Sequence, residues 1–239
     1  MATQVLKPSV SFLILALNEE KDIENTVNSV INATLQTPLS DYQLILVDDG
    51  SSDQTGVIMD KIAVNNSRFH VIHNEKNLGL GGAYSRGLSL ANCDYVMLIA
   101  GDDIMPADDI SKIIDQVGKA DIVLPYLTNP KLRYLGRRIG SRCYTIFINL
   151  LFGLNIRYYQ GMLPRRALLT KDVITTNSYA FLAEAAVKLL KKGASYVEVG
   201  IANTPSKKSG SVALQPKRLL GVLQAIFQLT VEIYFPSRK

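Results

Sequence analysis

The stretch YQLILVDDGSSD, residues 42–53, sets the pattern from which the fold of this chain can be predicted. Residues 42–47 form a short apolar run, typical of a strand that is buried on both faces of a sheet. The next four residues, DDGS, are turn formers, and Ser52-Asp53 suits the N-cap of a helix. Apolar residues then recur at helical spacing, at Val57, Ile58, Ile62 and Ala63. The stretch therefore predicts a strand, a tight turn and a helix.

This strand–turn–helix unit recurs through the first half of the chain. Strand-like apolar runs cover residues 9–17, 42–47, 69–73, 95–100 and 121–125, and helical patterns lie between them. Strands that alternate with helices predict right-handed crossovers and an α/β fold with a mostly parallel sheet. Ligands of such sheets bind at the carboxyl ends of the strands. We therefore expect the functional site at residues 17–19, 48–50 and 101–103.

The second half of the chain has a different pattern. Residues 131–142 are strongly basic, residues 143–154 are apolar, and a strand-like piece (158–164), a helix (179–192) and a strand (195–201) follow. Residues 203–216 predict a mobile loop, because they are rich in Ser, Lys, Gly and Pro. Residues 219–235 predict an amphipathic helix, too short and too polar to span a membrane, whose narrow polar stripe is Gln224, Gln228 and Glu232. We expect one domain, 1–239, with a donor-binding half (1–125) and an acceptor-binding, membrane-facing half (126–239).

Charge is distributed unevenly between the two halves. Of the 239 residues, 47% are apolar and 20% charged, which is typical of a globular protein and excludes disordered and fibrous classes. Residues 1–120 have 8 Lys and Arg against 16 Asp and Glu, a net charge of −8, and residues 121–239 have 18 against 5, a net charge of +13. An acidic half can hold a metal, and a basic half can hold phosphates or an anionic membrane. Nucleic acid is disfavoured, because no nucleic-acid motif accompanies the basic half.

The cysteines and the apolar segments of the sequence predict a cytoplasmic location. The two cysteines, Cys93 and Cys143, fit a reducing compartment. The apolar run at residues 10–17 is followed at once by Asn18-Glu19-Glu20, so it predicts a strand and not a signal peptide. No stretch of 18 uninterrupted apolar residues occurs, and no ordinary transmembrane helix is expected.

Two acidic turns carry the chemistry that the pattern allows. A carboxylate of Asp48 or Asp49 can accept hydrogen bonds from a nucleobase or a ribose hydroxyl, or it can simply belong to an acidic turn that caps a helix. Asp102 and Asp103 suit a hard divalent cation that also bridges phosphate oxygens, or they are solvated turn acids. Nearby Asp108-Asp109 is expected to be solvated in the first turn of a helix.

Four segments in fixed order carry a family resemblance. They are ALNEE (16–20), VDDGS (47–51), NLG with GGA (77–83), and DYVML leading to GDD (94–103). Over about the first 125 residues the chain resembles glycosyltransferase family 2, whose members have the GT-A fold. The resemblance implies a nucleotide-sugar donor, bound by Leu17, Asn18, Glu19, Asp48, Asp49, Gly79 and Gly101. It also implies Mg²⁺ or Mn²⁺ on the diphosphate: the second Asp of the family's Asp-x-Asp motif matches Asp102, while its first position is Ala100 here. Asp102 is then the main, catalytic metal ligand, and Asp103 a helper.

The acceptor is left to the second half. An alcohol acceptor needs a general base, whereas a phosphate oxygen is already anionic near neutrality. Glu184 lies on the predicted helix where many family members carry an acidic base, so it is either that base or a structural acid. The basic segment before the apolar run resembles the branch of the family that acts on polyprenyl phosphates. That resemblance implies that the acceptor phosphate meets Arg137, Arg138, Arg142 and Lys208.

Three functions therefore stay open at this point. The favoured one is transfer of a sugar from a UDP- or GDP-sugar, with inversion, to a polyprenyl phosphate by a peripheral enzyme at the cytoplasmic membrane face. A membrane-anchoring partner is compatible with it. The second is a soluble family 2 enzyme with a hydroxyl acceptor and Glu184 as base, and the third is a non-catalytic nucleotide-sugar-binding module. Processive polysaccharide synthases carry a Gln-x-x-Arg-Trp motif. The chain has no Trp, which argues against that class.

Overall fold

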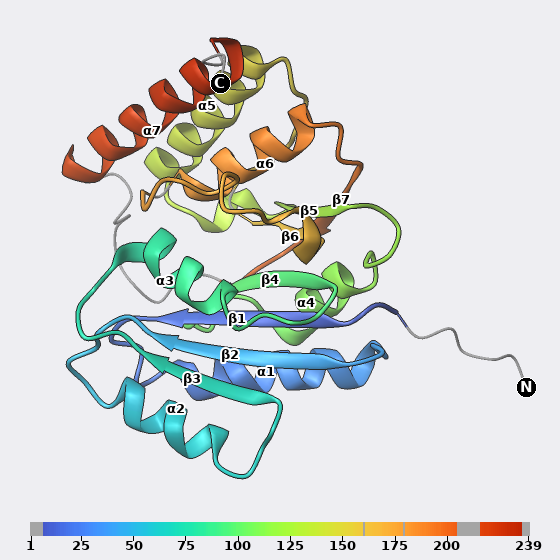
Figure 1. The fold of residues 1–239 in the computed structure, drawn as a ribbon, viewed down its shortest axis with the longest axis vertical. Helices are drawn as coiled ribbons and strands as arrows, with labels where there is room; N and C mark the ends of the chain where they lie inside the picture. Colours follow the sequence, from blue (N-terminus) through green and yellow to red (C-terminus); the bar gives the residue numbers. More distant parts are fainter. Residues whose placement is uncertain (1–6, 160, 179, 205–215, 236–239) are drawn as a thin grey trace, which may run out of the picture.

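The core of the molecule is a mostly parallel sheet, seen here in a computed structural model that describes residues 7–159, 161–178, 180–204 and 216–235. Strands β1 (Val10–Ala16), β2 (Tyr42–Asp48), β3 (Phe69–His73) and β4 (Tyr95–Ala100) are all parallel, in the order β3-β2-β1-β4 (Figure 1). The predicted α/β fold is thereby confirmed.

A second, smaller set of strands continues the sheet. It has the order β6-β5-β7, with β5 (Ile122–Leu127) parallel to β7 (Tyr196–Ile201) and antiparallel to β6 (Leu163–Pro164). A single bridge between Tyr95 of β4 and Arg165, next to β6, joins the two sets. The junction brings the acidic half of the sequence against the basic half.

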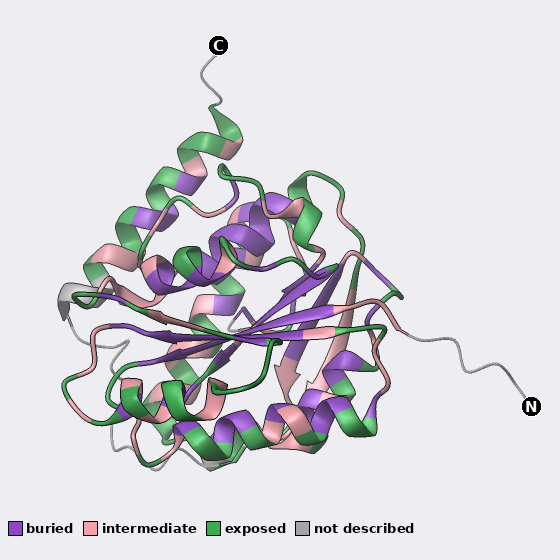
Figure 2. Cartoon of the chain, turned by 60° about the horizontal axis from the view of Figure 1, so that its bottom comes forward, coloured by how far each residue is buried: buried purple, intermediate pink, exposed green. Residues whose placement is uncertain are grey.

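Helices cover both faces of the sheet (Figure 1). They are α1 (Ile23–Gln36), α2 (Thr55–Ala63), α3 (Gly79–Leu88), α4 (Ala107–Ile114), α5 (Leu135–Phe152), α6 (Phe181–Lys191) and α7 (Pro216–Tyr234), with short 3-10 turns at Pro130–Leu132 and Arg166–Leu168. Alternate residues of β1 enter different cores. Phe12 and Ile14 pack with α1 and α4, and Leu13 and Leu15 pack on the side of α3 and α6. The strands are therefore buried on both sides (Figure 2), which explains their continuous apolar runs.

The basic and the apolar segments after β5 form one helix. Helix α5 places Thr145, Ile148 and Phe152 on its buried side, and it ends at Gly153, whose φ of 62° is left-handed. The strand predicted at residues 158–164 is wrong except at β6. Only Leu163 and Pro164 pair with β5. The side chain of Asn149 holds the chain just before this stretch, because it bonds both backbone groups of Ile156 (3.1 and 2.7 Å), and its oxygen also accepts a hydrogen bond from the Tyr159 hydroxyl (2.7 Å).

Helices α5 and α7 lie side by side at the end of the molecule farthest from α2 (Figure 1). The rings of Phe152 and Tyr234 stack at 6.1 Å, and the Tyr234 hydroxyl donates a hydrogen bond to Leu151 O (2.6 Å). Both helices leave large apolar side chains exposed. Nevertheless, none of the helices that the structure describes has the length and apolar character of a membrane span.

Candidate active site

The three predicted segments meet at one edge of the sheet, where β1, β2 and β4 end. The parallel register pairs Ala16 with Asp48 and Leu15 with Ala100. Backbone hydrogen bonds continue past the strands, from Asp49 N to Ala16 O and from Gly101 N to Leu15 O, both 2.9 Å long. The loops that follow the three strands therefore share one edge, as expected for a ligand site of a parallel sheet.

The loops after β1 and β2 are tied together by side chains. Asn18 has a left-handed φ of 55°, and its side-chain oxygen accepts a hydrogen bond from Ser52 N (2.9 Å). In return Asn18 N donates to the Ser51 hydroxyl (3.0 Å), and Glu19 N donates to the Thr55 hydroxyl (2.8 Å). Leu17 remains exposed beside them. These bonds fix the proposed nucleoside loops without using the side chain of Leu17.

Asp49 is buried and caps helix α3. Only 6% of the residue is exposed. Its carboxylate accepts hydrogen bonds from Asn74 Nδ2 (2.8 Å), Leu78 N (2.9 Å) and Gly79 N (3.0 Å). An anion at this place satisfies the free N–H groups and the positive end of the α3 dipole. Of the two interpretations of this acid, the geometry favours the cap, and a direct bond from Asp49 to a nucleoside stays a prediction.

Asp48 is held by a histidine that the sequence gave no reason to select. Oδ1 of Asp48 accepts a hydrogen bond from Ser51 N (2.9 Å), and Oδ2 lies 3.2 Å from His73 Nδ1. The other ring nitrogen of His73 lies 3.0 Å from Asp60 Oδ1. The bond to Asp60 is the largest cause of a raised pKa of His73, partial burial opposes it, and the bond to Asp48 adds to the rise. The one available signal was the register, in which Asp48 pairs with His73 at the ends of β2 and β3.

The loop after β4 is shaped by a close approach and by distant partners. A Cβ at Gly101 would lie 2.9 Å from Ala16 Cβ, so only glycine fits there. Asp103 has a φ of 54°, and its N–H donates a hydrogen bond to the Thr26 hydroxyl of α1 (3.0 Å). The Thr204 hydroxyl donates to Asp103 O (3.2 Å). The loop that carries Asp102 and Asp103 is thus held between α1 and the segment after β7.

Asp109 corrects the expectation of a solvated acid. It is 1% exposed, and its Oδ2 accepts hydrogen bonds from Ala202 N (2.9 Å) and Asn203 N (2.7 Å). Lys112 pairs with its other oxygen at 2.8 Å. Asp109 therefore fixes the start of the segment that leads to residues 205–215. Lys208, a predicted phosphate ligand, belongs to that stretch and lies outside the described residues.

The carboxylates present fit a cation that is coordinated partly by the protein and partly by a diphosphate. Among the described residues, no three or more His, Cys, Asp or Glu side chains group together as a metal site. A hard divalent cation such as Mg²⁺ needs only one or two protein carboxylates when phosphate oxygens and water supply the rest. Asp102 and Asp103, both half-buried, offer that partial set.

The basic segment reaches the acidic edge through Arg137. Burial lowers the pKa of the Arg137 guanidinium, the charge of Arg133 lowers it further, and the charge of Asp102 acts in the opposite direction. Arg133 in turn hydrogen-bonds the Tyr158 hydroxyl. Arg138 is half-buried and Arg142 is exposed on the same helix, α5. Among the causes that act on the pKa of Arg137, the charge of Asp102 is the smallest.

Glu184 faces the protein interior. Only 4% of it is exposed, and its carboxylate accepts hydrogen bonds from Thr175 N (3.2 Å), Thr176 N (3.1 Å) and Lys188 Nζ (2.8 Å). The Thr175 hydroxyl donates a further bond. A carboxylate that is surrounded by donors in this way is poorly placed to take a proton from an acceptor. The geometry therefore favours the structural alternative over a general base.

Comparison with known sequences places the chain in a family. It matches Glycosyl transferase family 2 over residues 11–163, and it belongs to that family. It is 31% identical over 117 residues to Glycosyltransferase GlyG of Streptococcus pneumoniae serotype 4, which covers 48% of this chain and 38% of GlyG. It is 32% identical over 133 residues to poly-beta-1,6-N-acetyl-D-glucosamine synthase of Staphylococcus aureus, a match that covers 55% of this chain and 31% of the synthase. The chain thus spans about a third of the length of the curated relatives it matches.

Solved structures agree on the fold. Mannosyl-3-phosphoglycerate synthase from Rubrobacter xylanophilus superposes with a TM-score of 0.72 at 19% identity, covering 97% of this chain and 77% of that one. Glucosyl-3-phosphoglycerate synthase from Mycobacterium tuberculosis, in complex with Mn²⁺, UDP-glucose and phosphoglyceric acid, gives 0.68 at 17% identity, covering 93% and 80%. The predicted GT-A fold is confirmed.

Proposed function

We propose that this protein transfers a sugar from a UDP- or GDP-sugar, with inversion, to a polyprenyl phosphate at the cytoplasmic face of a membrane. The observation that carries the proposal is the meeting of two chemistries at one edge of the sheet. The acidic loops end there, and the second half of the chain meets them through the Thr204 hydroxyl, which donates to Asp103 O (3.2 Å). The charge of Asp102 also acts on the pKa of Arg137 of the basic helix α5. A donor diphosphate with its cation and an anionic acceptor need such neighbouring sites.

On the donor side, the loops after β1 and β2 hold the nucleoside, with Leu17, Asn18 and Glu19 as its contacts. Asp48, Asp49, Gly79 and Gly101 shape this part of the site. Asp102, helped by Asp103, holds Mg²⁺ or Mn²⁺. The cation offsets the negative charge that develops on the leaving nucleoside diphosphate. In the solved structures of the enzyme from Mycobacterium tuberculosis, Mn²⁺ occurs with UDP-glucose and Mg²⁺ with UDP.

On the acceptor side, the phosphate meets Arg137, with Arg138, Arg142 and Lys208 as further cations. Guanidinium groups bind phosphate oxygens in a bidentate manner. A phosphate nucleophile needs no general base, which agrees with the buried, donor-filled environment of Glu184.

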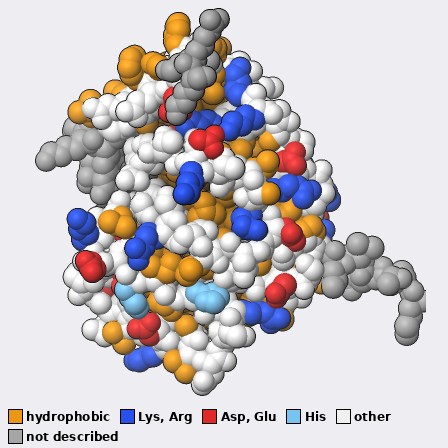
Figure 3. Space-filling view, viewed as in Figure 1, with side chains coloured by type: hydrophobic (Ala, Val, Ile, Leu, Met, Phe, Trp, Pro, Cys, Tyr) orange, Lys and Arg blue, Asp and Glu red, His pale blue; other side chains and the backbone are white. Residues whose placement is uncertain are grey.

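A membrane position of α5 and α7 would explain their exposed apolar faces. The exposed apolar side chains are Leu135, Ile139, Ile146, Phe147 and Leu150 on α5, and Leu220, Leu223, Phe227 and Val231 on α7. Side chains of this kind gather at that end of the molecule in Figure 3. Their helical spacing gives each helix one apolar stripe that continues into its neighbour. An interfacial helix buries such a stripe at the boundary between headgroups and acyl chains.

A water-soluble phosphorylated acceptor is the second candidate, because two solved relatives are named for phosphoglycerate. It would meet the same arginines but leave the apolar stripes unexplained. The test is a panel of labelled UDP- and GDP-sugars with Mg²⁺ or Mn²⁺, each offered polyprenyl phosphate, 3-phosphoglycerate or neither. Metal-dependent movement of label into the organic phase supports the proposal. Label in a soluble phosphorylated product supports the second candidate. Nucleotide binding without transfer in any arm would identify a non-catalytic binding module.

A further inference from the structure

Lys188 joins three separate parts of the chain. Its Nζ lies 2.8 Å from Glu184 Oε1 on its own helix, α6, and 2.7 Å from Glu232 Oε2 on α7. It also donates a hydrogen bond to Asp172 O (2.9 Å). The side chains of Lys188 and Glu184 are almost fully buried, whereas Glu232 is half-exposed. A buried ammonium group has three donors, and each of these partners takes one.

Glu184 passes this constraint to the backbone before α6. Its carboxylate receives the N–H groups of Thr175 and Thr176. A buried carboxylate keeps such bonds only if its charge is compensated, since an unpaired buried charge is strongly destabilising. Lys188 supplies that compensation. The conformation of residues 175–176 therefore depends on the lysine and on what holds it in place.

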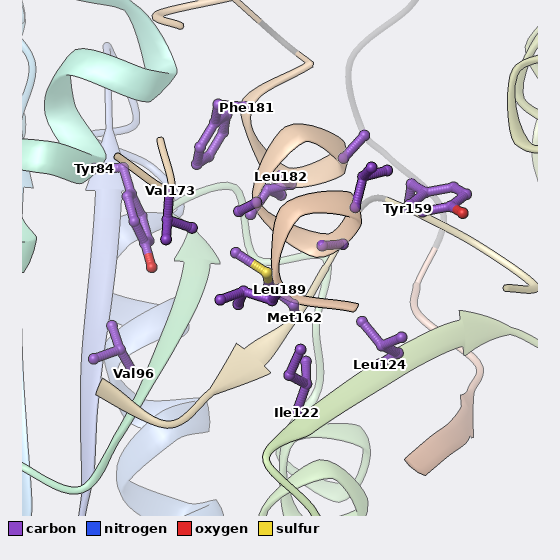
Figure 4. Packing of buried hydrophobic residues seen from close by; sticks show 14 of the residues in the cluster. Tyr84, Val96, Ile122, Leu124, Tyr159, Met162, Val173, Phe181, Leu182 and Leu189 are labelled. Atoms are coloured by element: carbon purple, nitrogen blue, oxygen red, sulfur yellow. The ribbon is translucent and has the colours of Figure 1, made fainter. Parts of the chain in front are cut away.

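Residues 176–177 in turn pack against the first turn of α3. A Cβ at Gly81 would lie 2.7 Å from Thr176 O and 2.8 Å from Asn177 Cα, so the two backbones are in direct contact. Tyr84 of α3 and Phe181 of α6 pack at 5.3 Å between ring centroids, beside Val173 (Figure 4). The first turn of α3 is the one that Asp49 caps at the nucleoside edge.

We propose that Glu232 is a positioning residue for donor binding: through Lys188 and Glu184 it ties helix α7 to residues 175–177, and these support the donor-side turn of α3. The proposal rests on the proposed function only for the identity of the ligand as a nucleotide. It gives the polar stripe of α7 a specific task. It also makes donor affinity depend on how α7 is docked, although Glu232 belongs to a helix remote from the donor loops.

The test compares two variants of this network with a control at Lys192, the residue that follows α6. Lys188→Met removes the central charge, and Glu232→Ala removes the half-exposed partner with less risk to folding. Lys192→Met breaks the exposed ion pair of Lys192 with the side chain of Asp172, whereas Lys188 bonds the backbone oxygen of Asp172. Amide hydrogen exchange at Thr175 and Thr176 is measured, together with the affinity for UDP and for GDP in the presence of Mn²⁺.

With Glu232→Ala we expect amide exchange at Thr175 and Thr176 to accelerate. We also expect the nucleotide dissociation constant to rise about fivefold, the lower end of the usual coupling between sites. Glu232→Gln, which keeps an acceptor for Lys188, restores part of both values. Lys192→Met resembles wild type. Exchange and affinity of Glu232→Ala that match those of Lys192→Met overturn the proposal, even if Lys188→Met fails to fold. A wild-type protein that binds neither nucleotide refutes the proposed function, while the exchange measurement still decides whether the tie exists.

Discussion

Replacing Asp49 with Asn tests whether this acid acts through helix α3. The variant has nearly the same shape, but an amide offers one acceptor oxygen where the carboxylate offers two. Oδ1 of Asp49 serves Asn74 and Leu78, and Oδ2 serves Gly79 at 3.0 Å. If the Asn oxygen keeps the first two donors, its NH₂ group must face the N–H of Gly79.

The loss in stability can be approximated from these contacts. The Gly79 N–H keeps a second acceptor, Asn77 Oδ1 at 2.8 Å, so the variant loses one hydrogen bond to a charged group, which costs about 1.5–3 kcal/mol. Loss of an anion at a helix N-terminus adds about 0.3–1 kcal/mol. We therefore expect the free energy of unfolding to fall by about 2–4 kcal/mol, which for a chain of this length lowers Tm by about 5–15 °C.

Urea unfolding and thermal unfolding measure the effect, with Asp108→Asn as control. Asp108 is exposed in the first turn of α4, so its variant should stay within about 0.5 kcal/mol of wild type. Nucleotide affinity is measured on the folded protein in parallel. An Asp49→Asn protein that is as stable as the control but no longer binds nucleotide would refute the capping interpretation, and would show that the carboxylate contacts the ligand directly.

Four further variants test other parts of the site. The pKa of His73 is raised, so its bonds to Asp48 and Asp60 stabilise the folded protein fully below the unfolded pKa of about 6.5. This stabilisation is lost as pH rises through the pKa of the folded state. Unfolding at several pH values should show the loss for wild type and not for His73→Gln. Gly101→Ala should lower stability by about 1–3 kcal/mol, because the added Cβ lies 2.9 Å from that of Ala16; denaturant midpoints measure it. Asp109→Ala should cost about 1–3 kcal/mol, since the two backbone N–H groups that share its Oδ2 lose their acceptor, and should speed amide exchange at residues 202 and 203. Arg137→Ala should reduce transfer to polyprenyl phosphate more than tenfold, as for truncation of a buried charge, with nucleotide affinity measured by titration unchanged.

The fold was predictable because the sheet leaves a periodic trace in the sequence. The central parallel strands β1, β2 and β4 are buried on both faces and are therefore continuous apolar runs, and the helices between strands show their own spacing. The strands of the first half were located to within two residues of β1 to β5. The strand predicted at residues 158–164 was wrong before Leu163, where the Tyr159 hydroxyl bonds the side chain of Asn149. The spacing of apolar residues does not reveal a contact of this kind with a side chain of the preceding helix.

The location of the site was predictable for a related reason. Acidic turn residues directly follow three apolar runs, and the carboxyl ends of parallel strands must meet at one edge. The task of each acid was not predictable in this way. Asp49 binds the start of α3, and Asp109 binds the segment after β7, 93 residues away in sequence. Such partners are fixed by the folded chain, and the local sequence of a turn cannot name them.

The charge asymmetry of the two halves illustrates the same limit. A count of −8 against +13 suggests an acidic surface and a basic surface. In the fold, however, Asp48, Asp49 and Asp109 are buried and bonded to backbone or side-chain donors. They act as internal acceptors that shape the loops. Asp102 and Asp103, which we propose as ligands of the cation, are half-buried. The charge of Asp102 acts on the pKa of Arg137, and in the proposed function these two residues stand on the donor side and the acceptor side of the reaction. Neutralising Arg137 should therefore disturb the acceptor reaction more than the loss of any single exposed charge elsewhere on α5.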